Sequence, residues 1–129
     1  MQYKTVYHAR PDILWYITER ENADKIMKKG IKPSLSAFEL PGTDDEKAVC
    51  AVHLGEYDKA RKLARMEDIE DPVAIEFIAK TYYECVAEKA DSWEESEFIN
   101  EEGPVHVGLC ITLDKVKAKW ITGNIKELG

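Results

Sequence analysis

The chain lacks the features that mark several large classes of protein. No apolar run among its 129 residues approaches the roughly 18 that a membrane-spanning helix requires. The segment from Met1 to His8 does not contain the apolar core of a secretory signal. The sequence also has no internal repeat and no low-complexity tract. We therefore expect a cytoplasmic protein with no membrane partner.

Cysteine is scarce, and its spacing argues against both disulfides and metal. Cys50, Cys85 and Cys110 are an odd number and lie far apart among apolar residues, so we expect reduced, buried thiols. Two pairs, Cys50 with His53 and His106 with Cys110, have spacings that suggest metal ligands. On a strand, however, residues three apart point to opposite faces, and residues four apart are separated by about 13 Å. That distance is too long for one zinc ion, so we expect no metal site.

The chain has fewer basic residues than acidic ones. The chain has 18 Lys and Arg against 25 Asp and Glu, and its formal net charge is −7. Nucleic-acid binding needs clustered Lys and Arg, so this balance does not favour a nucleic-acid target, although it leaves room for a local basic site. Acidic residues gather between Glu84 and Glu102. We interpret them as a solvated face, with a docking surface for a basic partner or an active-site rim as alternatives.

What the chain does contain is typical of one folded domain. Its hydrophobic fraction of 44% and charged fraction of 33% match those of ordinary globular proteins. A chain of 129 residues can bury one core, so we expect a single domain over residues 1–129. Apolar patterning predicts an α+β domain with five or six strands and two or three helices. The predicted elements are strands at 5–8, 13–18, 48–54, 73–78 and 105–112, a helix that ends at Gly30, a helix at 57–66, and a short turn or helix within 113–121.

The stretch from Leu14 to Ser34 is the most informative. It begins as a buried strand, after which Thr18 and Glu21 have the spacing of a capping box at a helix start. An apolar face follows, with lysines near the helix end, where they suit the helix dipole. Gly30 then supplies the left-handed residue that ends the helix.

Residues 73–90 allow two interpretations. Apolar residues alternate between residues 73 and 78, which favours a strand. An Asp-Pro pair directly before them could instead start one helix that runs to Ala90. We expect a strand followed by a helix, with one continuous helix as the alternative.

The order of these elements resembles that of small ADP-ribosyltransferase-fold proteins. Those proteins open with a strand of pattern Tyr-His-x-Thr and a helix that ends in Gly-Ile-x-Pro or Gly-Leu-x-Pro. Here Trp15-Tyr-Ile-Thr18 and Gly30-Ile-Lys-Pro33 stand at the corresponding places. The run from Val52 to Gly55 is similar to the Val-His-Leu-Ser strand of the RNA 2′-phosphotransferases. The matched pieces cover about half of the chain and also resemble the nucleic-acid-modifying ADP-ribosyltransferase toxins.

The resemblance implies two small, mostly antiparallel sheets that form a cleft for NAD, flanked by two or three helices. Nicotinamide leaves NAD as a neutral molecule, so the chemistry needs a held nicotinamide and a stabilised, oxocarbenium-like ribose. The catalytic residues implied are His53 and a carboxylate, Glu101 or Glu102. The cofactor contacts implied are Arg10, Tyr16, Thr18, Gly55 and Tyr57.

The first motif departs from the family pattern. Tyr16 stands where the family has a histidine, while a Tyr-His pair occurs earlier, at Tyr7 and His8, so either His8 or Tyr16 occupies the cleft position. Two functions therefore stay open. The first is an NAD-dependent ADP-ribosyltransferase that acts on a protein or nucleic-acid target. The alternative is a catalytically inactive acidic binding protein on the same fold, a phage- or plasmid-type inhibitor that binds a protein partner or sequesters an ADP-ribose-containing nucleotide.

Overall fold

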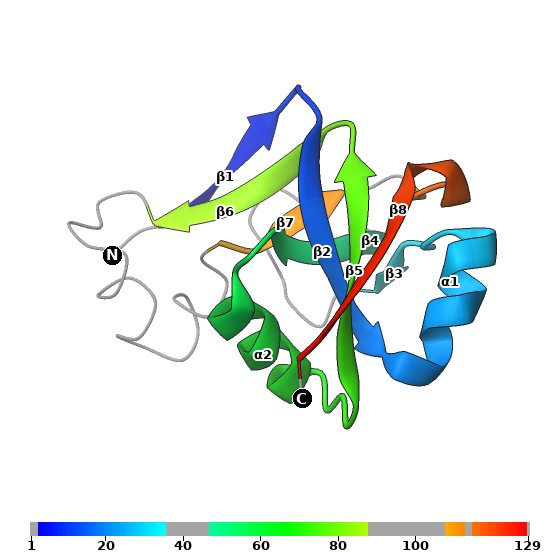
Figure 1. Ribbon diagram of the computed structural model, residues 1–129. Coiled ribbons are helices and arrows are strands. Elements are labelled where there is room, and N and C mark those ends of the chain that lie inside the picture. The colour runs from blue at the N-terminus through cyan, green and yellow to red at the C-terminus, as the bar shows by residue number, and fades with distance from the viewer. Residues whose placement is uncertain (1–2, 36–46, 88–107, 113–114, 129) are drawn as a thin grey trace.

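The computed structural model describes residues 3–35, 47–87, 108–112 and 115–128 (Figure 1). In these ranges the chain forms strands and two α-helices, with short 3-10 turns at Arg20–Asn22 and Ala118–Trp120. The elements are β1 (Tyr3–His8), β2 (Asp12–Glu19), α1 (Ala23–Lys29), β3 (Ser34–Leu35), β4 (Lys47–His53), α2 (Tyr57–Met66), β5 (Pro72–Ala79), β6 (Tyr82–Ala87), β7 (Cys110–Thr112) and β8 (Ile121–Glu127). None of the helices in the described ranges has the length and apolar character needed to cross a membrane.

The strands form one hydrogen-bonded antiparallel sheet, and the predicted α+β class is confirmed. The strand order is β1-β6-β7-β4-β2-β5-β8, and β3 pairs with β4 beside this path. The expected division into two separate sheets is not seen in the described residues. Strand β4 connects the two halves, because it pairs with β2 through Leu14 and His53 and with β7 through Ala51 and Cys110.

The sheet cannot be flat, because two short connections join strands that are far apart in the strand order. Strands β1 and β2 are four positions apart, a separation of about 19 Å in a flat sheet. The chain from His8 to Asp12 spans at most about 14 Å. Strands β5 and β6 are also four positions apart, yet only Lys80 and Thr81 lie between them. The sheet therefore curls, and the ends of β1, β2 and β6 approach one another (Figure 1).

The alternation of side chains along β2 places them in two of the three apolar clusters of the described core, one on each face of the sheet. Trp15 and Ile17 point to the face that α2 covers, where Ala60, Leu63 and Ala64 pack against them, as the helix periodicity predicts. Leu14 points to the opposite face and packs with other buried apolar side chains. The main ones on that face are Ile31, Val49, Phe77, Cys110 and Val116.

The predicted capping box at Thr18 is wrong. Strand β2 continues to Glu19 because Thr18 and Glu19 pair with Val73 and Pro72 of β5, and tertiary pairing overrides the local capping signal. Asn22 precedes α1 and makes no side-chain capping hydrogen bond. The Thr18 hydroxyl is buried and lies 3.3 Å from the side-chain nitrogen of Asn22, which donates to it.

The second half of the chain also differs from expectation in two places. The strand predicted at 73–78 is confirmed as β5, but the helix expected after it is wrong, because residues 82–87 form β6 between β1 and β7. Strand β8 was not predicted. It is an edge strand whose residues after Ile121 are all exposed, so no apolar alternation marks it in the sequence.

Candidate functional site

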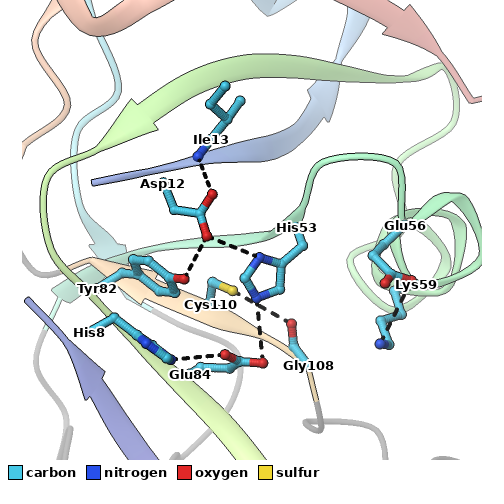
Figure 2. A network of polar contacts seen from close by, with 10 residues as sticks. All are labelled: His8, Asp12, Ile13, His53, Glu56, Lys59, Tyr82, Glu84, Gly108 and Cys110. Atoms are coloured by element: carbon cyan, nitrogen blue, oxygen red, sulfur yellow. Dashed lines mark hydrogen bonds and ion pairs between the residues drawn. The ribbon is translucent and has the colours of Figure 1, made fainter. Parts of the chain in front are cut away.

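Five polar and aromatic side chains converge where the sheet curls, and we name them the His53 cluster. They are His8, Asp12, His53, Tyr82 and Glu84, and Figure 2 shows them pointing toward one another. They come from four strands, β1, β2, β4 and β6.

Strand register explains why these residues share one face. Residues directly opposite each other in an antiparallel pair point to the same side, and so do residues two apart on one strand. His8 is opposite Tyr82, which is two residues before Glu84. His53 is opposite Leu14, which is two residues after Asp12. The curl of the sheet then brings the two groups together.

His53 lies between two carboxylates. Its Nδ1 is 3.9 Å from Oδ2 of Asp12, and its Nε2 is 3.4 Å from Oε2 of Glu84. Hydrogen bonding to Glu84 is the main cause that raises the pKa of His53 above its ordinary value, while partial burial opposes this effect. The arrangement favours the protonated imidazolium, which can return a proton to a substrate atom.

Glu84 bridges the two histidines. Its Oε1 is 3.0 Å from Nε2 of His8, while Oε2 faces His53. The side chain is 18% exposed, so it sits in a less polar setting than a surface carboxylate. The hydrogen bond to His53 is the largest effect on Glu84 and holds its pKa below the ordinary value, so this carboxyl stays ionised at neutral pH.

Tyr82 and a backbone amide hold Asp12. The Tyr82 hydroxyl donates to Oδ2 of Asp12 at 2.9 Å, and the amide of Ile13 donates to Oδ1 at 2.8 Å. The Tyr82 ring stacks on His8 with centroids 4.7 Å apart and meets the His53 ring edge-on. Burial raises the pKa of Tyr82, so it is a neutral hydrogen-bond donor.

The described residues do not form a metal centre. No group of three or more His, Cys, Asp and Glu in the described ranges has the geometry to hold a metal ion. Cys110 lies next to Glu84 across the β6–β7 pair, but burial raises the pKa of its thiol well above the ordinary value. A protonated thiol is a poor nucleophile, so the chemistry of this site rests on the imidazoles and carboxylates.

Of the residues proposed from the sequence, His53 and His8 belong to the cluster. Tyr16, the alternative to His8, lies outside the cluster but shares its face of the sheet. Tyr16 is half-buried against the core around Leu14, and burial raises its pKa. Thr18 is two residues farther along β2 and is buried. Tyr57 is on the other face, where its ring meets Trp15 edge-on with centroids 5.0 Å apart. Tyr16 and Tyr57 therefore do not line one cleft.

The other proposed residues lie outside the cluster. Arg10 is exposed in the bend between β1 and β2, and Gly55 is exposed in the turn that follows β4. Glu101 and Glu102 lie outside the described residues, so their role stays a prediction.

Sequence reasoning missed Asp12, Tyr82 and Glu84. All three side chains lie on the face of their strand that points into the curl of the sheet. Two of them, Tyr82 and Glu84, lie in β6, where a helix was expected. The sequence contains one signal that could have indicated this site: Tyr82 and Glu84 are two residues apart. If this run forms a strand, that spacing places both side chains on one face.

The pH dependence of stability should reveal the His53–Glu84 pair. The raised pKa of His53 gives stability that is fully present below its unfolded pKa of about 6.5 and is lost as the pH rises through the folded value. The lowered pKa of Glu84 gives stability that is present above about 4.5 and is lost as the pH falls. We expect His53→Gln to lower the melting temperature more at pH 6 than at pH 8.5.

Arg20→Gln is the matched control for this measurement. Arg20 makes two contacts with Asp71, at 2.9 and 3.2 Å, and these side chains stay charged at both pH values. Its deficit in melting temperature should therefore be the same at pH 6 and pH 8.5. A deficit for His53→Gln that is equally independent of pH would contradict the titration of the His53–Glu84 pair.

No protein-family model, no curated protein and no solved structure matches this chain.

Proposed function

We propose that this protein is an NAD-dependent ADP-ribosyltransferase that acts on a protein or nucleic-acid target, with the His53 cluster at the reacting ribose. The observation that carries the proposal is the position of His53 between Asp12 and Glu84 on the inner face of a curled sheet. The resemblance of the segments around Tyr16 and His53 to ADP-ribosyltransferase-fold proteins supports the same activity.

The electrostatics of the cluster suit this chemistry. The bond between the nicotinamide nitrogen and the ribose breaks, its electron pair leaves with nicotinamide, and positive charge develops on the ribose. Two carboxylates held in a partly buried site stabilise such a charge more strongly than water does. Glu84 and Asp12 also have lone pairs left to accept hydrogen bonds from ribose hydroxyls.

The acceptor atom of the target must lose a proton when it bonds to the ribose. The pairing with Glu84 raises the pKa of His53, so the fraction of His53 that is neutral is a stronger base than an isolated imidazole. That neutral form can take the proton, and Glu84 stabilises the imidazolium that results. Tyr82 supports this role because its hydroxyl and ring fix Asp12 and His8 beside His53. This chain thus supplies charge stabilisation and a base from one group of side chains.

The direct test is incubation of the full chain with NAD, followed by measurement of nicotinamide release and of the melting temperature. We expect saturable binding that raises the melting temperature, because a ligand that binds the folded state stabilises it by about 2.7 kcal/mol at 100 times its Kd. Nicotinamide release should follow, slowly without a target and faster with one. No thermal shift and no release at millimolar NAD would overturn the proposal.

Two observations favour the alternative of a catalytically inactive binding protein. The carboxylates and imidazoles of the His53 cluster contact each other, as in a purely structural network, and Tyr16 and Tyr57 lie on opposite faces of the sheet. This alternative predicts that NAD or ADP-ribose binds without any release of nicotinamide, or that only a protein partner binds.

A further inference from the structure

A second feature, separate from the His53 cluster, suggests a binding site. A cavity of ≈ 360 Å³ lies between the β5–β6 turn and the segment 115–120. This volume is within the range of small-molecule sites, roughly 300–1,000 Å³. The polar and aromatic side chains of its wall are Lys80, Thr81, Thr112, Lys115, Lys117 and Trp120.

The described residues of the wall carry a charge opposite to that of the whole chain. The full sequence has 25 acidic and 18 basic residues, yet the described residues of the wall include three lysines and no carboxylate. Surface lysines scattered by chance in an acidic protein would be mixed with carboxylates. The concentration of positive charge around a hollow indicates a site for an anion.

Two separate segments of the chain supply the lysines. Lys80 lies in the turn between β5 and β6, and its Nζ is 4.6 Å from the centre of the Trp120 ring. Lys115 and Lys117 lie on either side of Val116, whose backbone exchanges hydrogen bonds of 2.9 and 2.8 Å with Ile31. Both segments are therefore held in place, and all three lysines line the same cavity.

We propose that this cavity, which we call the lysine pocket, binds the diphosphate group of a small anion. Lysine binds phosphate as a point charge on a flexible stem, so ammonium groups from two segments can reach several oxygens of adjacent phosphates. Thr81 and Thr112 also line the cavity, and a threonine hydroxyl can donate a further hydrogen bond to a phosphate oxygen. The cavity is concave and small, which suits a soluble small molecule rather than the flat face of a macromolecule.

Anion binding in the lysine pocket does not depend on the proposed activity. Tyr82 of the His53 cluster directly follows Thr81 of the lysine pocket, but the diphosphate site stands on its own wall and charge. Inorganic pyrophosphate, which lacks a ribose and a nicotinamide, is therefore the probe for the lysine pocket alone.

The test is calorimetric titration of the full chain with sodium pyrophosphate, at an ionic strength kept constant with sodium chloride. We expect saturable binding with a Kd of about 1 mM or tighter, and weaker binding as salt is raised. The double variant Lys115→Gln, Lys117→Gln should weaken binding by about tenfold or more, as the loss of charge-assisted hydrogen bonds predicts. Both side chains are exposed, so the variant should fold.

Lys126→Gln is the matched control, because Lys126 is exposed on β8 and is not part of the wall. It removes one positive charge and should leave the pyrophosphate Kd unchanged. The proposal is overturned if pyrophosphate does not bind, or if the double variant binds as tightly as Lys126→Gln. Loss of pyrophosphate binding in the double variant with unchanged nicotinamide release would support a diphosphate site distinct from the reacting centre.

Discussion

Glu84→Gln is expected to lower the rate of nicotinamide release from NAD by about 10²- to 10³-fold, the effect of removing one positioned electrostatic group from a reacting centre. The glutamine keeps the shape of the side chain but removes its negative charge. Both imidazoles that Glu84 contacts, those of His8 and His53, then lose their ionic partner. The developing positive charge on the ribose loses the least exposed carboxylate of the cluster.

The measurement must separate lost chemistry from lost structure. Asp58→Asn is the matched control, because the Asp58 side chain is 99% exposed at the start of α2 and pairs only loosely with Arg61 at 3.7 Å. It should keep full activity. The melting temperature of Glu84→Gln should fall at pH 7, because the stability from the ionised Glu84 is lost, but the variant should still be folded at the assay temperature while its rate falls. An unchanged rate in a folded Glu84→Gln variant would remove Glu84 from the catalytic assignment.

The fold could be predicted from the sequence wherever local periodicity and tertiary packing agree. Helix α2 is an example: it spans Tyr57–Met66 as expected, because its apolar spacing matches the face that it buries on β2. Strand β5 was also predicted, because Val73, Ile75 and Phe77 recur at every second position and all three are fully buried. Strand β8 was not, because an exposed edge strand carries no burial pattern.

The candidate site was less predictable because it depends on the curl of the sheet. His53 was proposed from a local motif, and it is central. Its partners Asp12 and Glu84 are 41 and 31 residues away in the chain, so nothing near His53 in the sequence points to them. Two short connections, at 9–11 and 80–81, create the curl, and their effect follows only from the strand order.

Gly30→Ala is expected to cause the largest loss of stability among single methyl additions to the described glycines. Gly30 ends α1 as predicted, but it has φ 83° and ψ −173°, a region that only glycine occupies readily, at a cost of about 1–3 kcal/mol for other residues. A methyl group there would also overlap the backbone carbonyl oxygen of Val116, which accepts the 2.8 Å hydrogen bond from Ile31. The melting temperature should fall on the order of 10 °C, measured by calorimetry.

Gly123→Ala separates the two causes of this loss. Gly123 also has a positive φ, 97°, but a methyl group there would meet nothing within 4 Å, so only backbone strain remains. If the overlap with Val116 matters, Gly30→Ala must cost clearly more than Gly123→Ala, and equal losses would contradict it. The added methyl group should also displace the segment around Val116, which lies between Lys115 and Lys117. We therefore expect Gly30→Ala to bind pyrophosphate more weakly at the lysine pocket, at temperatures where the variant is still folded. Gly123→Ala should bind pyrophosphate normally, which would tie the close backbone contact at Gly30 to the position of the two lysines.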